Sequence, residues 1–240
     1  RIMVSEFMLQ QTQVERVIPK YKEFLKKFPN FSALDRASLA DVLKEWQGLG
    51  YNRRALMLKK LAGRVIAEYN GTLPADPALL DGLPGIGKGT AGAIAAFAFQ
   101  IPAPFIETNI RRVFLYFFFP QEKEVSDVIL LEVIGRTVDA KNPREWYYAL
   151  MDYGAMLGRG TKENPNRRSR HYAKQSRFEG SDRQVRGQIL KLMLEDHRWS
   201  SAAIIKKIDQ PEDRALRILH ALEREGFLKN RKGSYSINVP

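Results

Sequence analysis

A glycine-rich hairpin and a carboxylate that follows it are the features of this chain best suited to chemistry. The hairpin spans residues 83–91 (LPGIGKGTA), and Glu107 comes after the next apolar stretch. Gly85 and Gly87 let the backbone turn sharply and approach a partner closely. Their N–H groups, at the start of a helix, would form an anion site that suits a phosphate. In so basic a chain, the first anion to consider is the backbone of DNA.

The elements that must position these residues are helices, because apolar residues recur at helical spacing up to about residue 157. We therefore predict a mostly α fold. Ser32 and Ser38 are expected as N-caps. The aromatic residues Phe114 and 116–119 could stack on bases, but their helical spacing beside a proline favours a place in the core. The predicted helices cover residues 2–28 (as one or two helices), 32–36, 39–45, 52–69, a short segment after Asp76, 90–99, 109–118, 124–138 and 143–157.

The composition changes after residue 158. Residues 159–180 are rich in Lys and Arg and poor in aliphatic residues, which is typical of a basic linker or arm. Helices are predicted over 182–195, 201–208 and 211–225, and a strand, a turn and a second strand follow over 226–237. Three helices closed by a β-hairpin predict a winged helix-turn-helix-like domain over 181–240.

The overall composition narrows the class of partner and of cofactor. A net charge of +12 favours a polyanion, nucleic acid before membrane, although the charge could serve solubility alone. The chain has no cysteine, which excludes disulfides and cysteine-ligated zinc or iron–sulfur clusters. Its three histidines are too scattered to predict a metal site. No apolar run of ~20 residues occurs, so no membrane partner is expected.

The start of the sequence carries no visible targeting signal. In the absence of a signal peptide, we expect a cytoplasmic, nucleoid-associated protein. We also expect it to act as a monomer. The sequence opens at Arg1 inside a helical pattern and without an initiator Met, so an N-terminal piece is expected to be missing.

Five blocks of the sequence resemble MutY-type adenine DNA glycosylases, in the order typical of that family. They cover residues 1–157, whereas a single helix-hairpin-helix would be a weak signal. The blocks are residues 5–14 (SEFMLQQTQV), 48–51 (GLGY), the hairpin 83–91, residues 104–113 (PFIETNIRRV) and residues 151–155 (MDYGA). The resemblance implies a two-lobed HhH-GPD glycosylase domain over 1–158 with its active site between the lobes, and a flipped-out nucleotide as substrate.

The resemblance also assigns catalytic roles. Glu6 matches the family's acid, which protonates the leaving base and handles the water, and its apolar neighbours would favour the protonated form. Glu107 stands where the family has its catalytic Asp, which stabilises the cationic sugar. The longer side chain leaves three outcomes open: intact chemistry, a changed substrate or a crippled enzyme. Alternatively, Glu107 only begins the next helix. Asn109 matches a family residue near the sugar.

Other positions are carried over as DNA contacts. Related lyases place a nucleophilic Lys at the position of Gly89, so Gly here implies a monofunctional enzyme without AP-lyase activity. Gln11 and Tyr51 match residues that wedge into the duplex near the orphan base. For Leu49, ordinary packing of the turn is the alternative. The remaining predicted DNA contacts are Thr12 and Gly50 beside the wedge, Gly85, Ile86, Gly87, Lys88 and Thr90 in the hairpin, and Arg167, Arg168 and Arg170 in the basic stretch.

Two departures from the family limit the prediction. The four cysteines that hold the family's iron–sulfur cluster are absent, so we expect no cofactor, although a monovalent cation at the hairpin is possible. The family's C-terminal domain, which reads 8-oxoguanine, has no visible counterpart. The predicted function is a monofunctional mismatch DNA glycosylase of base excision repair that removes adenine opposite guanine or 8-oxoguanine from double-stranded DNA. The alternatives are a uracil or thymine mismatch glycosylase on the same fold, and a non-catalytic DNA-binding protein.

Overall fold

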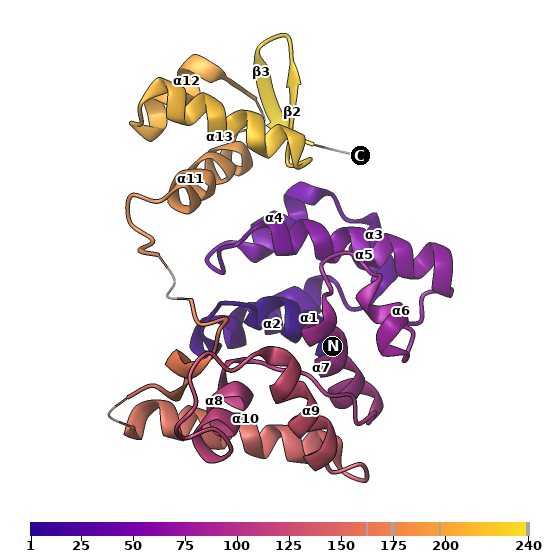
Figure 1. Ribbon diagram of the computed structural model, residues 1–240. Helices are drawn as coiled ribbons and strands as arrows, with labels where there is room; N and C mark the ends of the chain where they lie inside the picture. Colours follow the sequence, from indigo (N-terminus) through magenta and orange to yellow (C-terminus); the bar gives the residue numbers. More distant parts are fainter. Residues whose placement is uncertain (162, 174–175, 197, 239–240) are drawn as a thin grey trace. The chain divides into compact units, whose positions relative to one another are not determined.

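The computed structural model describes residues 1–161, 163–173, 176–196 and 198–238, most of which are helical (Figure 1). The other six positions, 162, 174, 175, 197, 239 and 240, fall in the predicted linker and C-terminal module and lie outside the described residues. The chain divides into two compact units. Unit 1 contains residues 3–72 and 176–240 with Arg1, and unit 2 contains residues 73–175 with Ile2.

The first part of unit 1 is helical, as the sequence predicted. Asn30 caps α3, since its side chain accepts from the Ala33 N–H, so the expected cap at Ser32 is wrong by two residues. The Ser38 side chain accepts from the Asp41 N–H as predicted. Asn70 ends the longest helix of this part in the left-handed conformation. The helices are α1 (Ile2–Leu9), α2 (Val14–Lys27), α3 (Phe31–Arg36), α4 (Leu39–Trp46) and α5 (Arg53–Tyr69).

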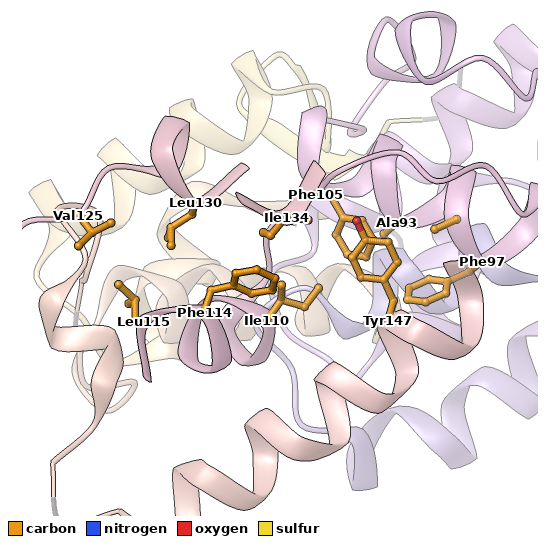
Figure 2. Packing of buried hydrophobic residues seen from close by; sticks show 11 residues of the cluster. Ala93, Phe97, Phe105, Ile110, Phe114, Leu115, Val125, Leu130, Ile134 and Tyr147 are labelled. Carbon is orange, nitrogen blue, oxygen red and sulfur yellow. The ribbon is translucent and has the colours of Figure 1, made fainter. Parts of the chain in front are cut away.

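Unit 2 is built around a hydrophobic cluster that joins its helices (Figure 2). Phe97, Phe105 and Tyr147 form its aromatic end, with ring centroids 4.1–6.3 Å apart. The Tyr147 hydroxyl donates to the Ala103 carbonyl at 2.9 Å, which satisfies the polar end of a buried ring. The elements of unit 2 are α6 (Pro77–Asp81), α7 (Lys88–Phe99), α8 (Thr108–Phe117), α9 (Asp127–Thr137), α10 (Pro143–Gly160) and the 3-10 helix η1 (Pro165–Arg168).

The close packing of α8 against α10 explains one block of the sequence. A Cβ built on Gly154 would lie 2.3 Å from the Asn109 carbonyl oxygen, so only glycine lets the two helices approach this closely. Gly154 therefore fixes the position of α8, the helix that Glu107 precedes.

Part of the predicted basic linker is packed and is not an exposed arm. Pro165, Asn166 and Ser169 are buried, and Val125 pairs with Ser169 in a β-bridge. The Asn166 side-chain amide donates to the Thr108 carbonyl at 3.1 Å. The sequence missed this packing because polar side chains, and not aliphatic ones, make the contacts.

The aromatic run after Phe114 is also different from the prediction. Phe114 is buried, but Tyr116, Phe117 and Phe118 are exposed, with Phe117 at 54%. The core side of α8 is supplied by the residues of its other face, Ile110, Val113, Phe114 and Leu115.

The C-terminal part of unit 1 has the predicted three helices and a hairpin. These are α11 (Asp182–Glu195), α12 (Ser201–Ile208), α13 (Glu212–Arg224), β2 (Leu228–Arg231) and β3 (Ser234–Ile237), with a short β1 (Trp199–Ser200) that the sequence did not reveal. The strands form an antiparallel sheet in the order β1-β3-β2, in which Asn230 lies opposite Tyr235. None of the helices in the described parts of the chain is both long and apolar enough to cross a membrane.

Candidate active site

Glu107 occupies a half-buried position at the amino end of α8 in unit 2. Its Oε1 accepts hydrogen bonds from the Asn109 N–H at 2.6 Å and the Ile110 N–H at 2.7 Å. Burial raises the pKa of the Glu107 carboxyl, while these two N–H groups and the nearby Arg112 charge oppose the rise. The carboxylate thus caps α8, as the alternative interpretation expected, and is also a fixed and partly desolvated negative charge.

Asn109 is held by an arginine that the sequence did not single out. Arg112 donates to the Asn109 side-chain oxygen at 2.7 Å and also to the Gly154 carbonyl. Because the amide oxygen accepts from Arg112, the amide N–H₂ of Asn109 is the end suited to donate to a ligand. A basic residue on an amphipathic helix gives no sequence signal for such a role.

The hairpin before α7 has the geometry of an anion site. Gly85 lies in the left-handed region at φ 79°, as the predicted turn requires. No side chain among the described residues caps α7 at Gly87, and the first N–H groups of a helix have no acceptor within the helix itself. Lys88 is exposed at the same end. This combination of helix-end N–H groups and a cation suits a phosphate.

Two hairpin residues need a more specific description. Ile86 is only 6% exposed and its N–H donates to the Leu83 carbonyl at 3.1 Å, so it stabilises the hairpin and leaves the glycines, Lys88 and Thr90 as the predicted phosphate contacts. A Cβ built on Gly89 would lie 3.4 Å from the Ile106 carbonyl oxygen. A side chain at position 89 would therefore begin beside the segment that carries Glu107.

Glu6 lies in unit 1 on α1. It is half-buried on a short helix whose Met3, Val4, Phe7 and Met8 side chains are buried. The predicted apolar surroundings are therefore present on its own helix.

The predicted wedge residues lie on two turns of unit 1, Gln10–Thr12 and Gly48–Asn52, which we call the probing turns. Gln11 and Tyr51 adopt left-handed backbone conformations, at φ 53° and 47°. The Thr12 hydroxyl donates to the Leu49 carbonyl at 3.3 Å, so the two turns are in contact. Gln11 is exposed and Tyr51 half-buried, whereas Leu49 is 2% exposed. Burial of Leu49 favours the alternative that its side chain packs the turn.

Two further arginines surround Tyr51, and neither was identified from the sequence. The guanidinium carbon of Arg54 lies 5.6 Å from the centre of the Tyr51 ring, and that of Arg183 lies 5.3 Å from it. Arg183 belongs to α11 and also donates to the Tyr51 hydroxyl. The C-terminal part of the chain thus contributes one residue to the predicted wedge.

The remaining basic residues differ in how far their charges are already engaged. Arg167 and Arg170 are exposed, while Arg168 donates to the Pro120 carbonyl. On α13, Arg214 and Arg217 both donate to Asp182, each at 2.9 Å. The exposed face of α13 therefore presents less unpaired charge than its sequence suggests.

The donor set does not fit the iron–sulfur cluster of MutY-type glycosylases. Such a cluster is held by cysteine thiolates, and this chain has none. In the parts of the chain that the structure describes, no three His, Asp or Glu side chains gather in a way that could hold a metal ion.

Comparison with known proteins gives consistent matches. The family described as "HhH-GPD superfamily base excision DNA repair protein" matches residues 4–132. The adenine DNA glycosylase of Mycobacterium tuberculosis (strain ATCC 25618 / H37Rv) is 34% identical over 218 residues, covering 80% of this chain and 69% of that protein. That of Buchnera aphidicola subsp. Baizongia pistaciae is 37% identical over 166 residues, covering 68% of this chain and 46% of that protein. The chain thus spans about half the length of some curated relatives that it matches.

Solved structures agree on the fold. A thermostable thymine-DNA glycosylase aligns with a TM-score of 0.60 and 26% identity, covering 68% of this chain and 76% of that one. A trapped endonuclease III–DNA covalent intermediate aligns with a TM-score of 0.57 at 22% identity, covering 65% and 73% of the two chains. At 22% identity, the alignment with endonuclease III supports only a shared fold.

Proposed function

Since the chain belongs to the HhH-GPD superfamily of base excision DNA repair proteins, we propose that it is a monofunctional mismatch DNA glycosylase. It removes adenine opposite guanine or 8-oxoguanine from double-stranded DNA. It acts as a monomer, without an iron–sulfur cluster, on nucleoid DNA in the cytoplasm. The observation that carries the proposal is Glu107, a half-buried carboxylate fixed by two backbone N–H groups beside the Gly89 end of the hairpin.

The chemistry follows from what the two carboxyl groups can do. Breaking the glycosidic bond leaves positive charge on the sugar and negative charge on the departing base. Glu6 donates a proton to the base and afterwards accepts one from the attacking water. Glu107 remains ionised and stabilises the cationic sugar, which a charge held rigidly by its own helix does without reorganisation. The hairpin holds the DNA backbone through phosphate.

The absence of an amine at position 89 supports the monofunctional assignment. A strand break requires a nucleophilic amine that forms a Schiff base with the sugar, and glycine offers none. The adenine assignment is supported by the names of the Mycobacterium and Buchnera relatives.

A second substrate class is favoured by two observations. The thermostable thymine-DNA glycosylase aligns over two thirds of this chain. Glu107 is also a departure from the adenine-type pattern, which has Asp at this position, and it lies at the predicted site. Thymine or uracil opposite guanine is therefore the second candidate substrate.

A substrate panel separates these assignments. The protein is incubated with duplexes that carry A:G, A:8-oxoG, U:G, T:G or hypoxanthine:T, and strand breaks are measured with and without alkali. Breaks that require alkali on the adenine duplexes support the proposal. Breaks on T:G or U:G alone favour the second candidate, and breaks without alkali contradict the monofunctional assignment.

Glu6→Gln provides the internal control. It should abolish base release while duplex binding is retained, because only the proton donor is removed. Binding by the wild type without release from any duplex would contradict the proposal and leave a non-catalytic DNA-binding protein.

A further inference from the structure

We propose that Arg54 is the positioning residue that locks the two probing turns together, and that recognition of the mispaired nucleotide depends on it. The inference rests on the proposed function, since it names a residue that acts on the site's specificity without touching DNA. The partners of the Arg54 guanidinium come from both turns and from the carboxyl end of α1.

One guanidinium nitrogen of Arg54 closes the carboxyl end of α1. Its Nη1 donates to the carbonyls of Phe7 at 2.8 Å, Met8 at 2.8 Å and Gln10 at 2.6 Å. The last carbonyls of a helix have no helical partner, and a cation placed there is favourable. Since Glu6 lies on the same helix, Arg54 fixes the end of the element that carries the predicted acid.

The second guanidinium nitrogen, Nη2, bonds the Gly48–Asn52 turn and also Thr12 of the Gln10–Thr12 turn. Nη2 donates to the Leu49 carbonyl at 3.2 Å, to the Gly50 carbonyl at 3.0 Å and to the Thr12 hydroxyl at 2.9 Å. A single planar fork therefore bonds both probing turns at once. Lysine, with one ammonium group, could not span them in this way.

The position is costly for a residue that serves packing alone. Arg54 is 8% exposed, and no carboxylate lies among its hydrogen-bond partners in the described part of the chain. Burial lowers the pKa of its guanidinium to about 10, so the buried group is still charged near neutral pH. A charge buried without a counter-ion is tolerated only when its donors are satisfied. Here the acceptors are oxygens of the two turns and of the carboxyl end of α1.

The two turns are also strained where they are predicted to probe the duplex. Gln11 and Tyr51 both lie in the left-handed region, which non-glycine residues seldom adopt, and each directly follows a residue whose carbonyl Arg54 holds. Without the guanidinium, these carbonyls lose the donor that keeps the two turns in register. A misplacement of ~1 Å in such a group can cost ~10²-fold in rate.

The experiment compares Arg54→Met and Arg54→Lys with Arg64→Met. Arg64 lies on the same helix, is exposed and pairs with Glu68, so its change to Met removes the same group at a site away from the turns. Each variant is measured for thermal unfolding and for single-turnover base release per active molecule. In the Glu6→Gln background, where the duplex stays intact, the ratio of affinities for an A:8-oxoG duplex and a fully matched duplex is also measured.

We expect the Arg54 variants to lose most of this affinity ratio while binding matched DNA as before. Base release per active molecule should fall by roughly 10²-fold in Arg54→Met. Arg54→Lys keeps the charge and restores stability relative to Arg54→Met, but not the affinity ratio. Arg64→Met should match the wild type in all three measurements.

Three outcomes separate this inference from the proposed function. Arg54 variants that are less stable but keep the wild-type affinity ratio and rate per active molecule would overturn the inference and leave the function standing. If the wild type binds mismatched DNA preferentially but releases no base, the proposed function is wrong. Loss of that binding preference in Arg54→Lys would still support the inference. A wild type with no preference for any mispair overturns the inference as well.

Discussion

Unit 1 and unit 2 hold their predicted DNA-facing groups in different ways. In unit 2, near neighbours in the sequence fix the groups, because Glu107 caps the helix that it precedes and Gly85 turns the hairpin through its own backbone. In unit 1, the probing turns are distant in sequence and are joined by the Thr12 hydroxyl and by the side chain of Arg54. A locally built site fails when its own residues change. A site held together by a distant side chain can also fail when a residue that touches no ligand is changed.

Glu107→Gln tests the locally built site and should have the largest effect of the changes made in unit 2. Glutamine keeps an oxygen that can accept from the Asn109 and Ile110 N–H groups, so α8 remains capped while the negative charge is lost. We expect the rate of base release to fall roughly 10²–10³-fold, as when one group that stabilises transition-state charge is removed. Single-turnover kinetics on an A:8-oxoG duplex measure the loss.

Glu145→Gln is the matched control for this variant. Glu145 lies in the first turn of α10 in the same unit and is exposed. It should leave both the rate and the thermal unfolding unchanged. If Glu107→Gln also kept nearly full activity, Glu107 would be a helix cap and nothing more.

Gly85→Val should separate DNA affinity from chemistry in the same unit. A β-branched residue at φ 79° is strained by about 1–2 kcal/mol, so the hairpin shifts and the protein is less stable. Duplex affinity should fall by about tenfold for matched and mismatched DNA alike, because phosphate contacts carry no sequence information. Titration of both duplexes by fluorescence anisotropy measures this.

Gly187→Ala provides the comparison for that glycine substitution. A Cβ at this helical position of α11 meets no atom within 4 Å, so alanine should stabilise the fold by about 0.5–1 kcal/mol and leave affinity unchanged. If Gly85→Val lowered the affinity for mismatched DNA only, the hairpin would recognise the mismatch itself. The two units would then not differ in the way proposed here.

The pH dependence of Glu107 gives a smaller effect with a definite sign. Burial raises its pKa above the ordinary 4.5, so base release should decline as pH falls through the raised value. Stability should change in the opposite direction. The folded state holds this proton more tightly than the unfolded state does, so the contribution of Glu107 to the free energy of unfolding decreases as pH rises from 4.5 through the raised pKa, and is constant above it.

Urea unfolding of the wild type and Glu107→Gln over a pH series measures this contribution. The difference between the two free energies of unfolding isolates Glu107 from the other titrating groups. A difference that grows with rising pH would show that the two N–H bonds outweigh burial, and would contradict a raised pKa for this carboxyl.

The same contrast explains what the sequence could predict. The hairpin, Glu107 and most helices are encoded by residues a few positions apart, so turn glycines, caps and periodicity revealed them. The cap at Asn30 was missed by two residues because Ser32 is an equally good cap by type. Gly154 belongs to a recognised block. The reason for glycine there is that a Cβ would lie 2.3 Å from the Asn109 carbonyl oxygen, and this appears only when α8 and α10 are packed together.

The residues that the sequence could not reveal act over long distances along the chain. Arg54 reads as one more basic residue next to the exposed Arg53, and its partners are seen only when two turns meet. Arg183 reaches Tyr51 across more than half of the chain. The packing of Asn166 under Thr108 likewise depends on a polar contact between distant segments, for which hydrophobic periodicity gives no signal.

A pair of single substitutions gives the smallest expected effects and tests whether paired and unpaired cations differ. Lys88, at the uncapped end of α7, should contact a phosphate, whereas Arg217 on α13 is engaged by Asp182 at 2.9 Å. Lys88→Ala should weaken binding uniformly and lower the slope of log affinity against log salt by about 1. Arg217→Ala should change duplex affinity by less than about twofold and leave the slope as it was.

The pKa of Asp182 agrees with this expectation. Hydrogen bonds from Arg217 and Arg214 lower it, as expected when the carboxylate is paired with these two cations. If Arg217→Ala lowered the slope as much as Lys88→Ala, then α13 would bind phosphate despite its ion pairs. The affinity for DNA would then depend on the number of basic residues, and not on whether their donors are free of other partners.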